Sequence, residues 1–370
     1  SGSRSTTVLS GDEEAVTNAV LKVTRDSIKT LCFAIGHAEK DLKDTGPEGL
    51  SSFQAAVEKQ QTRVESFSPG MGVPDACAAV VVAGPRRPWL PAEVEKLQAY
   101  LDGGGSAAIL LDPGADSGLE PLLGRYGISV SRDLIVDRVS ALFGGKPDIP
   151  MVPADGYESH PITKSFRYQT FFPLATSLDL AAEPPAGVSL QALARTTPLS
   201  WGEKDYEKEA LTGTLRMDPG DRPGPLDLAA VATRPAEAAS PEPASDSPKP
   251  AKPETRLVVF GDSDFPCNAY FSATSNGELF QNIANWISGQ EDLVAIPAKS
   301  RLPVVVNLSQ RQASLIWIVS LLVAPAAILV VDVERGLAPM DEEVAAILRH
   351  SGCPACVAAN KADNPGRDGA

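Results

Sequence analysis

The chain has 370 residues, 43% of them hydrophobic, which is enough for two or three domains with ordinary cores. Its net charge of −14 and the lack of any run rich in lysine and arginine argue against a nucleic-acid partner, because binding phosphates requires clustered basic side chains. Its five cysteines do not resemble a disulfide framework. Cys32 and Cys77 stand in apolar runs, where cysteine is usually a small core hydrophobe.

The N-terminal region is polar and contains no apolar segment typical of a signal peptide. Residues 12–25 have the apolar spacing of a short amphipathic helix, and we treat residues 1–26 as a separate N-terminal remnant. We therefore expect either that the chain faces the cytoplasm or that its N-terminal part is missing.

The next hundred residues alternate between apolar runs and amphipathic segments. Each run ends at glycine, proline or a polar residue, and Pro91 followed by Gly103 marks the start and the end of one clear helix. The expected strands are residues 31–36, 77–83 and 107–111, and the expected helices are residues 49–60, 91–101 and 119–126. Strands that are apolar on both faces predict an α/β fold with a mostly parallel sheet covered on two sides.

The second half of the body is less regular. Residues 128–180 show no clear period, and residues 234–254 contain mainly proline, alanine, serine and charged residues, which predicts a disordered insert. A strand at 257–260 and a helix at 279–288 then continue the α/β pattern. We therefore expect one α/β domain over residues 27–298 with the insert as a loop inside it.

Residues 314–331 form an uninterrupted apolar run of 18 residues. This length is near the lower limit for a helix that crosses a hydrocarbon core of ~30 Å, and a buried core helix is the alternative. Trp317 near one end suits a membrane interface, and Pro325 is tolerated more readily in a membrane helix than in a soluble one. The run predicts a single transmembrane helix.

Several segments together resemble the auxiliary component of uncharacterised ABC transport systems, a family similar to the gliding-motility-type ABC accessory subunit. They occur in the family's order and cover roughly residues 10–325. The matching pieces are IGHAEKDL, VVVAGPRRPWLPAEVEKLQAYLDGGGSAAILLDPGAD, ESHPITKSF, FFPLATSL, VVFGDSDFPCNAYF, GELFQNIANWISGQEDLV and the apolar run.

The resemblance implies a flavodoxin-like sheet of the class I glutamine amidotransferase type. It also implies a body outside the cytoplasm, with membrane helices at both ends. Such a protein would act together with a permease and an ATPase, which are separate chains. Because the family's first helix has no counterpart here, we expect a sequence truncated at its N-terminus. The expected location is the inner membrane, crossed once.

Catalysis in such a fold needs a cysteine or serine on a sharp strand-to-helix turn with a histidine nearby. The turn after the strand at 107–111 holds Asp112-Pro113-Gly114-Ala115, which contains no nucleophile. We therefore expect a non-catalytic binding subunit without a cofactor. An amidotransferase-like or carbohydrate-active enzyme of the same fold is the alternative.

Ligands of parallel α/β sheets bind beyond the carboxyl ends of the strands. The polar side chains expected there form the predicted ligand or partner site, and they are His37, Glu39, Asp112, Asp262, Ser263 and Asp264. The alternative is that they bond backbone groups in turns or cap the next helix. A metal held by Asp262, Asp264 and His37 has no support from their spacing, and we expect no metal. His160, which precedes Pro161, is expected to be structural.

The segment from 332 to 370 differs in character from the body. Together with the end of the apolar run it resembles a piece of the tandem-domain ribosome-assembly GTPases: a strand, a helix at 341–349, a strand and the guanine motif Asn360-Lys361-Ala362-Asp363. The chain has no phosphate-binding loop, so we expect Asn360, Lys361 and Asp363 to be vestigial, with guanine-nucleotide binding as the alternative. The junction suggests a chimeric sequence. The pair Cys353 and Cys356 is a weak zinc signal without a second pair.

Overall fold

The computed structural model describes residues 28–142, 146–206, 216–236, 254–272, 275–291, 327–332, 344–346 and 355–360. Two compact units, Ser1–Pro303 and Val304–Ala370, make up the chain, and each is considered by itself. The helix predicted at 12–25 and the guanine-motif residues Lys361 and Asp363 lie outside the described residues.

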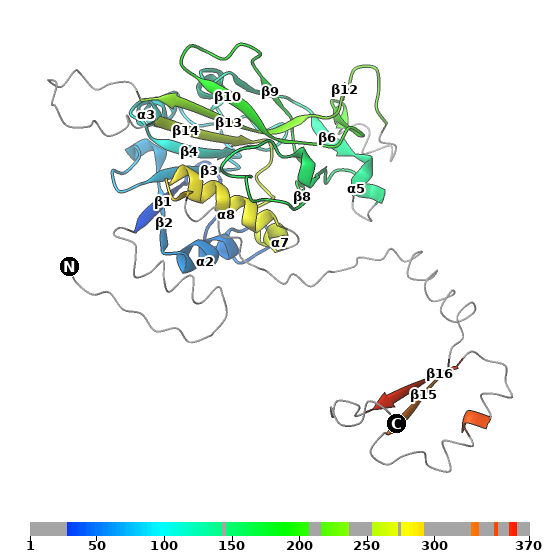
Figure 1. The fold of residues 1–370 in the computed structure, drawn as a ribbon. Helices are drawn as coiled ribbons and strands as arrows, with labels where there is room; N and C mark the ends of the chain where they lie inside the picture. The colour runs from blue at the N-terminus through cyan, green and yellow to red at the C-terminus, as the bar shows by residue number, and fades with distance from the viewer. Residues whose placement is uncertain are drawn as a thin grey trace, which may run out of the picture. The chain divides into compact units, whose positions relative to one another are not determined.

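A seven-stranded sheet forms the centre of the first unit, in the order β10-β13-β14-β4-β3-β1-β2 (Figure 1). Its strands are β1 (Lys29–Ala34), β2 (Thr62–Phe67), β3 (Ala79–Ala83), β4 (Ser106–Leu110), β10 (Ser189–Arg195), β13 (Asp227–Pro235) and β14 (Glu254–Phe260). The five neighbours from β2 to β14 run parallel, and β13 is antiparallel to both of its neighbours. The predicted mixed α/β fold with a mostly parallel sheet is confirmed.

Strands β3 and β4 lie in the middle of the sheet, and every residue of both is buried. Their side chains alternate between two cores, because successive residues of a strand point to opposite faces. Val81 and Ala108 belong to one hydrophobic cluster, whereas Val82 and Ile109 belong to the other. This explains the continuous apolar runs in the sequence, since both faces of these strands are covered.

Helices cover both faces of the sheet. Phe53 and Val57 of α2 (Ser51–Lys59) and the apolar side of α8 (Asn276–Ile287) belong to the first cluster. On the other face, α3 (Pro91–Asp102) and α4 (Glu120–Gly124) contribute to the second cluster. The carboxylate of Glu93 accepts a hydrogen bond from the Leu90 N–H at 2.9 Å, which satisfies one free donor where α3 begins.

Small elements lie in the irregular stretch at 128–180 and at several other places in the first unit. Strand β11 (Ser200–Glu203) pairs antiparallel with β6 (Leu134–Asp137) and with β12 (Arg222–Pro223). The remaining pairs and short helices are β5 (Ile128–Val130) with β9 (Leu178–Leu180), β7 (Met151–Val152) with β8 (Thr170–Phe171), α5 (Arg138–Leu142), α7 (Asn268–Phe271), η1 (Pro69–Met71) and η2 (Ala154–Gly156).

The ends of the predicted insert at 234–254 belong to the sheet. Strand β13 continues to Pro235, and β14 begins at Glu254, which is the register partner of Pro235. The two strands therefore pair up to the point where the chain leaves them. Residues 237–253 lie outside the described residues.

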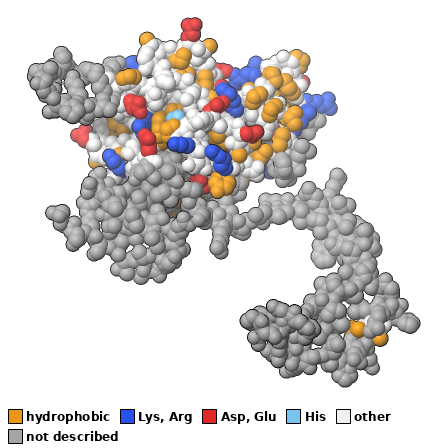
Figure 2. Space-filling view, in the orientation of Figure 1, with side chains coloured by type: hydrophobic (Ala, Val, Ile, Leu, Met, Phe, Trp, Pro, Cys, Tyr) orange, Lys and Arg blue, Asp and Glu red, His pale blue; other side chains and the backbone are white. Residues whose placement is uncertain are grey.

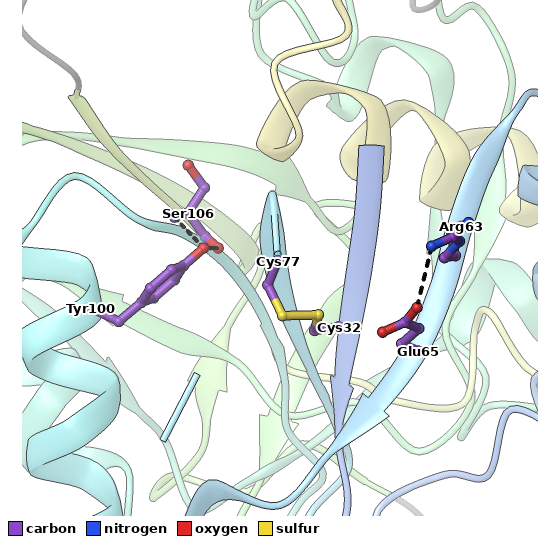
Figure 3. Close-up of a disulfide and its surroundings, with 6 residues drawn as sticks. All are labelled: Cys32, Arg63, Glu65, Cys77, Tyr100 and Ser106. Atoms are coloured by element: carbon purple, nitrogen blue, oxygen red, sulfur yellow. Dashed lines mark hydrogen bonds and ion pairs between the residues drawn. A yellow bond between two sulfur atoms is a disulfide. The ribbon is translucent and has the colours of Figure 1, made fainter. Parts of the chain in front are cut away.

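A disulfide joins Cys32 to Cys77, so the prediction of two free core thiols is wrong (Figure 3). Cys32 lies in β1, and Cys77 precedes β3, the neighbouring strand of the sheet. Their Cα atoms are 5.6 Å apart although 45 positions separate them in the sequence. Both side chains remain in the second hydrophobic cluster, so the apolar setting was right and the oxidation state was not.

Strand β2 is the last strand on its side of the sheet within the described part of the chain. Arg63 and Glu65 form an ion pair at 3.8 Å on this strand, visible beside the disulfide in Figure 3. On the molecular face shown in Figure 2, basic side chains lie among acidic ones instead of forming a continuous basic stripe.

The second unit contains two parallel strands, β15 (Ala327–Asp332) and β16 (Ala355–Asn360), and residues 344–346 between them are helical. The predicted membrane helix at 314–331 is therefore wrong over residues 327–331, which belong to β15. Residues 314–326 lie outside the described residues. Within the described ranges, no helix has the length and apolar character needed to span a bilayer.

Candidate functional site

The parallel strands β1, β3, β4 and β14 end at the same edge of the sheet, where ligands of such sheets bind. The six predicted site residues follow three of these strands. His37 and Glu39 follow β1, Asp112 follows β4, and Asp262, Ser263 and Asp264 follow β14. The structure divides them into two groups, because β3 lies between β1 and β4.

The first group joins the turn after β4 to the turn after β14. Asp112 accepts hydrogen bonds from the Ser263 backbone N–H at 2.8 Å and from the Ser263 hydroxyl at 2.7 Å. Gly84, at the end of β3, allows this close approach: a Cβ atom there would lie 2.3 Å from Ser263 Oγ. Burial raises the pKa of Asp112, against the lowering effect of the bond from Ser263.

Lys40 supplies a buried positive charge to the same group. Its ammonium contacts Asp264 Oδ1, and its side chain is only 4% exposed. The backbone N–H of Lys40 donates to Ala83 O at 2.9 Å, which holds the loop after β1 against the end of β3. Burial works to lower the pKa of Lys40, but the hydrogen bond to Asp264 and the nearby negative charges raise it overall.

Asp262 is completely buried beside these groups. Its Oδ1 accepts a hydrogen bond from the Asp264 N–H at 2.7 Å, whereas its Oδ2 has no hydrogen-bond partner among the described residues. Burial raises the pKa of Asp262 well above its ordinary value, and the charges of Asp112 and Asp264 raise it further.

The second group, His37 and Glu39, is held against the start of α3. His37 Nε2 lies 3.0 Å from a Glu93 carboxylate oxygen, and the His37 ring stacks on Trp89 with ring centroids 5.6 Å apart. Glu39 accepts hydrogen bonds from the His37 backbone N–H at 2.7 Å and from Trp89 Nε1 at 3.2 Å. These contacts fasten the loop after β1 to the segment between β3 and α3.

A pocket of about 730 Å³ opens beside the first group. Asp112 and Asp264 lie in its wall, together with Arg86 from the loop after β3 and residues of the small sheet formed by β6, β11 and β12. The remaining wall residues are Pro113, Gly114, Ala115, Arg132, Asp133, Leu134, Leu174, Glu203, Lys204, Asp205 and Tyr206. Charged groups of both signs therefore line this space.

Sequence reasoning missed Lys40, Trp89 and Glu93, although each contacts a predicted site residue. Lys40 carried no signal, because lysine three residues after a histidine in a loop normally faces solvent. Trp89 and Glu93 carried a weak signal, because both lie at the predicted start of the helix α3. The pocket residues that belong to the small sheet could not be predicted. Nothing in the sequence indicates that this sheet lies beside the ends of β4 and β14.

Two other expected features have clear positions. His160 accepts a hydrogen bond from the Ile162 N–H at 3.3 Å and lies edge-on against the Trp286 ring, in agreement with a structural role. Asn360 is the last residue of β16 in the second unit.

Comparison with solved structures gives distant likenesses of fold. The mmIFT52 N-terminal domain matches 70% of this chain and 97% of its own length, at 19% identity and a TM-score of 0.49. A putative ThuA-like protein from Parabacteroides merdae matches 75% of this chain and 94% of its own length, at 11% identity and a TM-score of 0.37. The exo-β-1,4-mannosidase Op5Man5 from Opitutaceae bacterium strain TAV5 matches 76% of this chain and 37% of its own length, at 8% identity and a TM-score of 0.35.

No curated protein matches the sequence. The model of one protein family, described as ABC-type uncharacterized transport system, matches residues 28–290. These residues contain the seven-stranded sheet, its covering helices and both groups of site residues. Because this match spans more than half of the 370 residues, the chain belongs to the ABC-type uncharacterized transport system family, as an auxiliary component.

Proposed function

We propose that this chain is a non-catalytic binding subunit of an ABC transporter. In this proposal it binds a ligand or partner at the carboxyl edge of its sheet and presents it to the permease. The family match over residues 28–290 is the observation that carries the proposal, and the pocket beside Asp112 and Asp264 supports a binding role. ATP hydrolysis belongs to a separate ATPase subunit, because the sequence contains no phosphate-binding loop.

The groups at the strand ends support the non-catalytic part of the proposal. The turn after β4 holds no nucleophile, and Cys267 is buried at 1% exposure. Burial raises the pKa of the Cys267 thiol to about 12, so it remains protonated at neutral pH, whereas nucleophilic attack requires the thiolate. The thiol instead donates to Glu48 O at 3.1 Å.

We also propose that the sheet is flavodoxin-like. Numbered along the chain, the five parallel strands β1, β2, β3, β4 and β14 have the spatial order 2-1-3-4-5, which is the flavodoxin order. Two antiparallel strands, β13 and β10, extend this core beyond β14. In this proposal the binding pocket lies on the β4–β14 side of the carboxyl edge.

The body is further proposed to lie outside the cytoplasm, at the inner membrane beside the permease. The Cys32–Cys77 disulfide supports this location, because disulfides persist in oxidising compartments and are rare in the cytosol. Quenching source cells in acid and alkylating with a mass-adding maleimide tests it. In the proposed location Cys32 and Cys77 take up label only after reduction; labelling without reduction would contradict it.

Affinity purification tests the transport role. A tagged full-length chain is cross-linked in source cells, purified from detergent-solubilised membranes and analysed by mass spectrometry. We expect the permease and the ATPase of one ABC system to co-purify in a constant ratio, because an auxiliary component works beside both. Absence of both subunits from the purified material would contradict the proposal.

Reconstitution then tests the role of the pocket. With the co-purified transporter in nanodiscs, adding the wild-type chain is expected to change the ATPase rate. We expect Asp112→Asn to reduce that effect, and Asp116→Asn, at an exposed position of the same loop, to retain it. A hydrolytic activity on glycosides or amides that is lost on His37→Ala and on Asp262→Asn would instead indicate an enzyme.

A further inference from the structure

Three carboxylates converge at the carboxyl edge of the sheet. One oxygen from each of Asp112, Asp262 and Asp264 lies within 4.8 Å of the other two. They come from the turns after β4 and β14, which are adjacent parallel strands, so the backbone of the sheet fixes their spacing. The hydrogen bonds from Ser263 to Asp112 join the two turns directly.

The positive charge within the cluster does not balance the negative charge. When ionised, the three aspartates carry three negative charges, and Lys40 supplies one positive charge through its contact with Asp264. Arg86 lies in the same pocket wall, but it is exposed and pairs with Glu48 at 2.8 Å. With all three aspartates ionised, two negative charges would remain in this partly buried space, a state that is costly unless a further cation offsets it.

The second, independent observation is the unpartnered oxygen of Asp262. This side chain is 0% exposed, and its Oδ2 has no hydrogen-bond partner among the described residues. A buried carboxylate oxygen in this position requires another group beside it.

We propose that Asp112, Asp262 and Asp264 bind a hard divalent cation, Ca²⁺ or Mg²⁺. Each aspartate contributes one carboxylate oxygen, the ligand atom that these cations prefer over nitrogen or sulfur. Asp112 and Asp264 also line the pocket, so water or a bound ligand can complete the coordination from that side. The cation balances the two remaining charges and gives the Asp262 oxygen its partner.

These three ligands differ from the set considered in the sequence analysis, which was Asp262, Asp264 and His37 and had no support from spacing. His37 lies with Glu93 and Trp89 through its Nε2 atom and its ring face, and Asp112 takes the third position in the cluster. The spacing along the chain could not show this, because Asp112 and Ser263 are 151 residues apart. The inference goes beyond the proposed transport function, since neither the family match nor the pocket requires a metal.

Titration of the purified full-length chain tests the site. The protein is stripped with EDTA, dialysed and titrated with CaCl2 and with MgCl2 by calorimetry, while thermal unfolding gives Tm at each concentration. We expect a stoichiometry of one and a rise in Tm with concentration for at least one of the two cations, because a ligand that binds the native state raises Tm by mass action. Mn²⁺, followed by loss of its free electron-paramagnetic-resonance signal, gives an independent count of sites.

Asp262→Asn separates cation binding from a purely structural role. Without cation, the variant is expected to unfold at the wild-type Tm or above, because the neutral amide cannot add a negative charge beside Asp112 and Asp264. With cation, its rise in Tm is expected to be much smaller than that of the wild type, because the amide oxygen that replaces the carboxylate carries no negative charge. Asp116→Asn, which removes an exposed acid in the same loop as Asp112, is expected to keep the full rise.

Two results would overturn the proposal. One is a wild-type chain with no heat of binding and no change in Tm at about 10 mM of either cation, roughly ten times the weakest Kd typical of calcium modules. The other is an equal rise in Tm for wild type and Asp262→Asn, which would place the bound ion elsewhere. Both measurements use the isolated chain, so they are independent of whether permease and ATPase co-purify.

Discussion

At the scale of single residues, the carboxyl edge depends on how closely two turns approach. Gly84 adopts a positive φ of +63°, and a Cβ atom there would lie 2.3 Å from Ser263 Oγ and 3.1 Å from Asp112 Oδ2. Gly114 also has a positive φ, +68°, but nothing lies within 4 Å of its Cβ position. The two glycines therefore separate the effect of backbone conformation from the effect of close packing.

Replacing Gly84 by alanine is expected to lower the free energy of unfolding by about 2–4 kcal/mol. A side chain at positive φ costs about 1 kcal/mol or more, and forcing atoms into a packed site adds about 1–3 kcal/mol. Gly114→Ala has only the cost of the positive φ, so its free energy of unfolding should fall by about 1 kcal/mol. Urea unfolding followed by circular dichroism measures both, and equal losses in the two variants would contradict the packing argument.

His160 makes stability depend on pH. Burial, helped by the nearby Arg256 charge and opposed by Glu291, lowers the pKa of His160 from 6.5 to about 4. The unfolded chain therefore binds a proton between pH 6.5 and 4 that the folded chain does not, so the histidine destabilises the fold as pH falls through this window. Since the ring is partly exposed, we expect the loss to be about 1–2 kcal/mol.

The check compares wild type with His160→Gln in urea at pH 7.5 and at pH 4.5. Other groups titrate in both proteins, so only the difference between them reports on His160. The wild type should lose about 1–2 kcal/mol more than the variant over this interval. Parallel losses would mean that protonated His160 is accommodated in the folded state.

At the scale of elements, the sequence predicted the buried parallel strands and the helices between them. β3, β4 and β14 are continuous apolar runs, and α3 has a proline at its start and glycines after its end. β2 escaped prediction because its middle carries Arg63 and Glu65, which suits an edge strand and gives no apolar run. β13 escaped because its buried part is rich in alanine, which favours a helix and is depleted in strands.

The disulfide joins β1 to the residues just before β3, and it could not be predicted for a different reason. Two cysteines 45 positions apart carry no information on which strands are neighbours. The strand order decides this, because β1 pairs with β3 and leaves β2 at the edge. A strand order of 1-2-3 would have separated the two sulfur atoms by a whole strand.

Reduction of this disulfide is expected to lower the free energy of unfolding by about 2–4 kcal/mol. Closing a loop of 45 positions restricts the unfolded chain, for which the chain-entropy relation gives about 4 kcal/mol as an upper value. Urea unfolding with and without a phosphine reductant measures the change. The double variant Cys32→Ala/Cys77→Ala should have a lower free energy of unfolding than the wild type, and the reductant should not change it.

Cys267→Ala provides the matched control, because Cys267 is buried and has a free thiol. This variant should keep the full response to the reductant. A wild-type chain that unfolds identically in both conditions would show that the bond contributes nothing to stability.

At the scale of the whole molecule, the sequence predicted that each of the six candidate residues follows a strand, but it did not predict how they are grouped. Each stands after an apolar strand, which the sequence shows, but the groups they form depend on which strands are adjacent. β4 and β14 are neighbours, so Asp112 meets Asp262 and Asp264. β3 separates β1 from β4, so His37 meets Trp89 at the start of α3 instead.

The two units lead to a prediction about truncation. Both large hydrophobic clusters draw their buried residues from positions 31–287, within the first unit. A chain that ends at Pro303 is therefore expected to unfold with the wild-type midpoint in urea, within about 0.5 kcal/mol in free energy, as expected of an independent domain. A clear fall in the midpoint would show that the second unit stabilises the first.

The sheet also fixes the order in which the molecule can be completed during synthesis. β4 is made early, but its partner β14 follows after the chain has passed through β5 to β13. At about 5–20 residues per second, the 151 residues from Asp112 to Ser263 take the ribosome roughly 8–30 s. During that time one side of β4 remains unpaired, and the aspartate cluster does not yet exist. The nascent chain is therefore expected to need a chaperone until residue 264 has emerged.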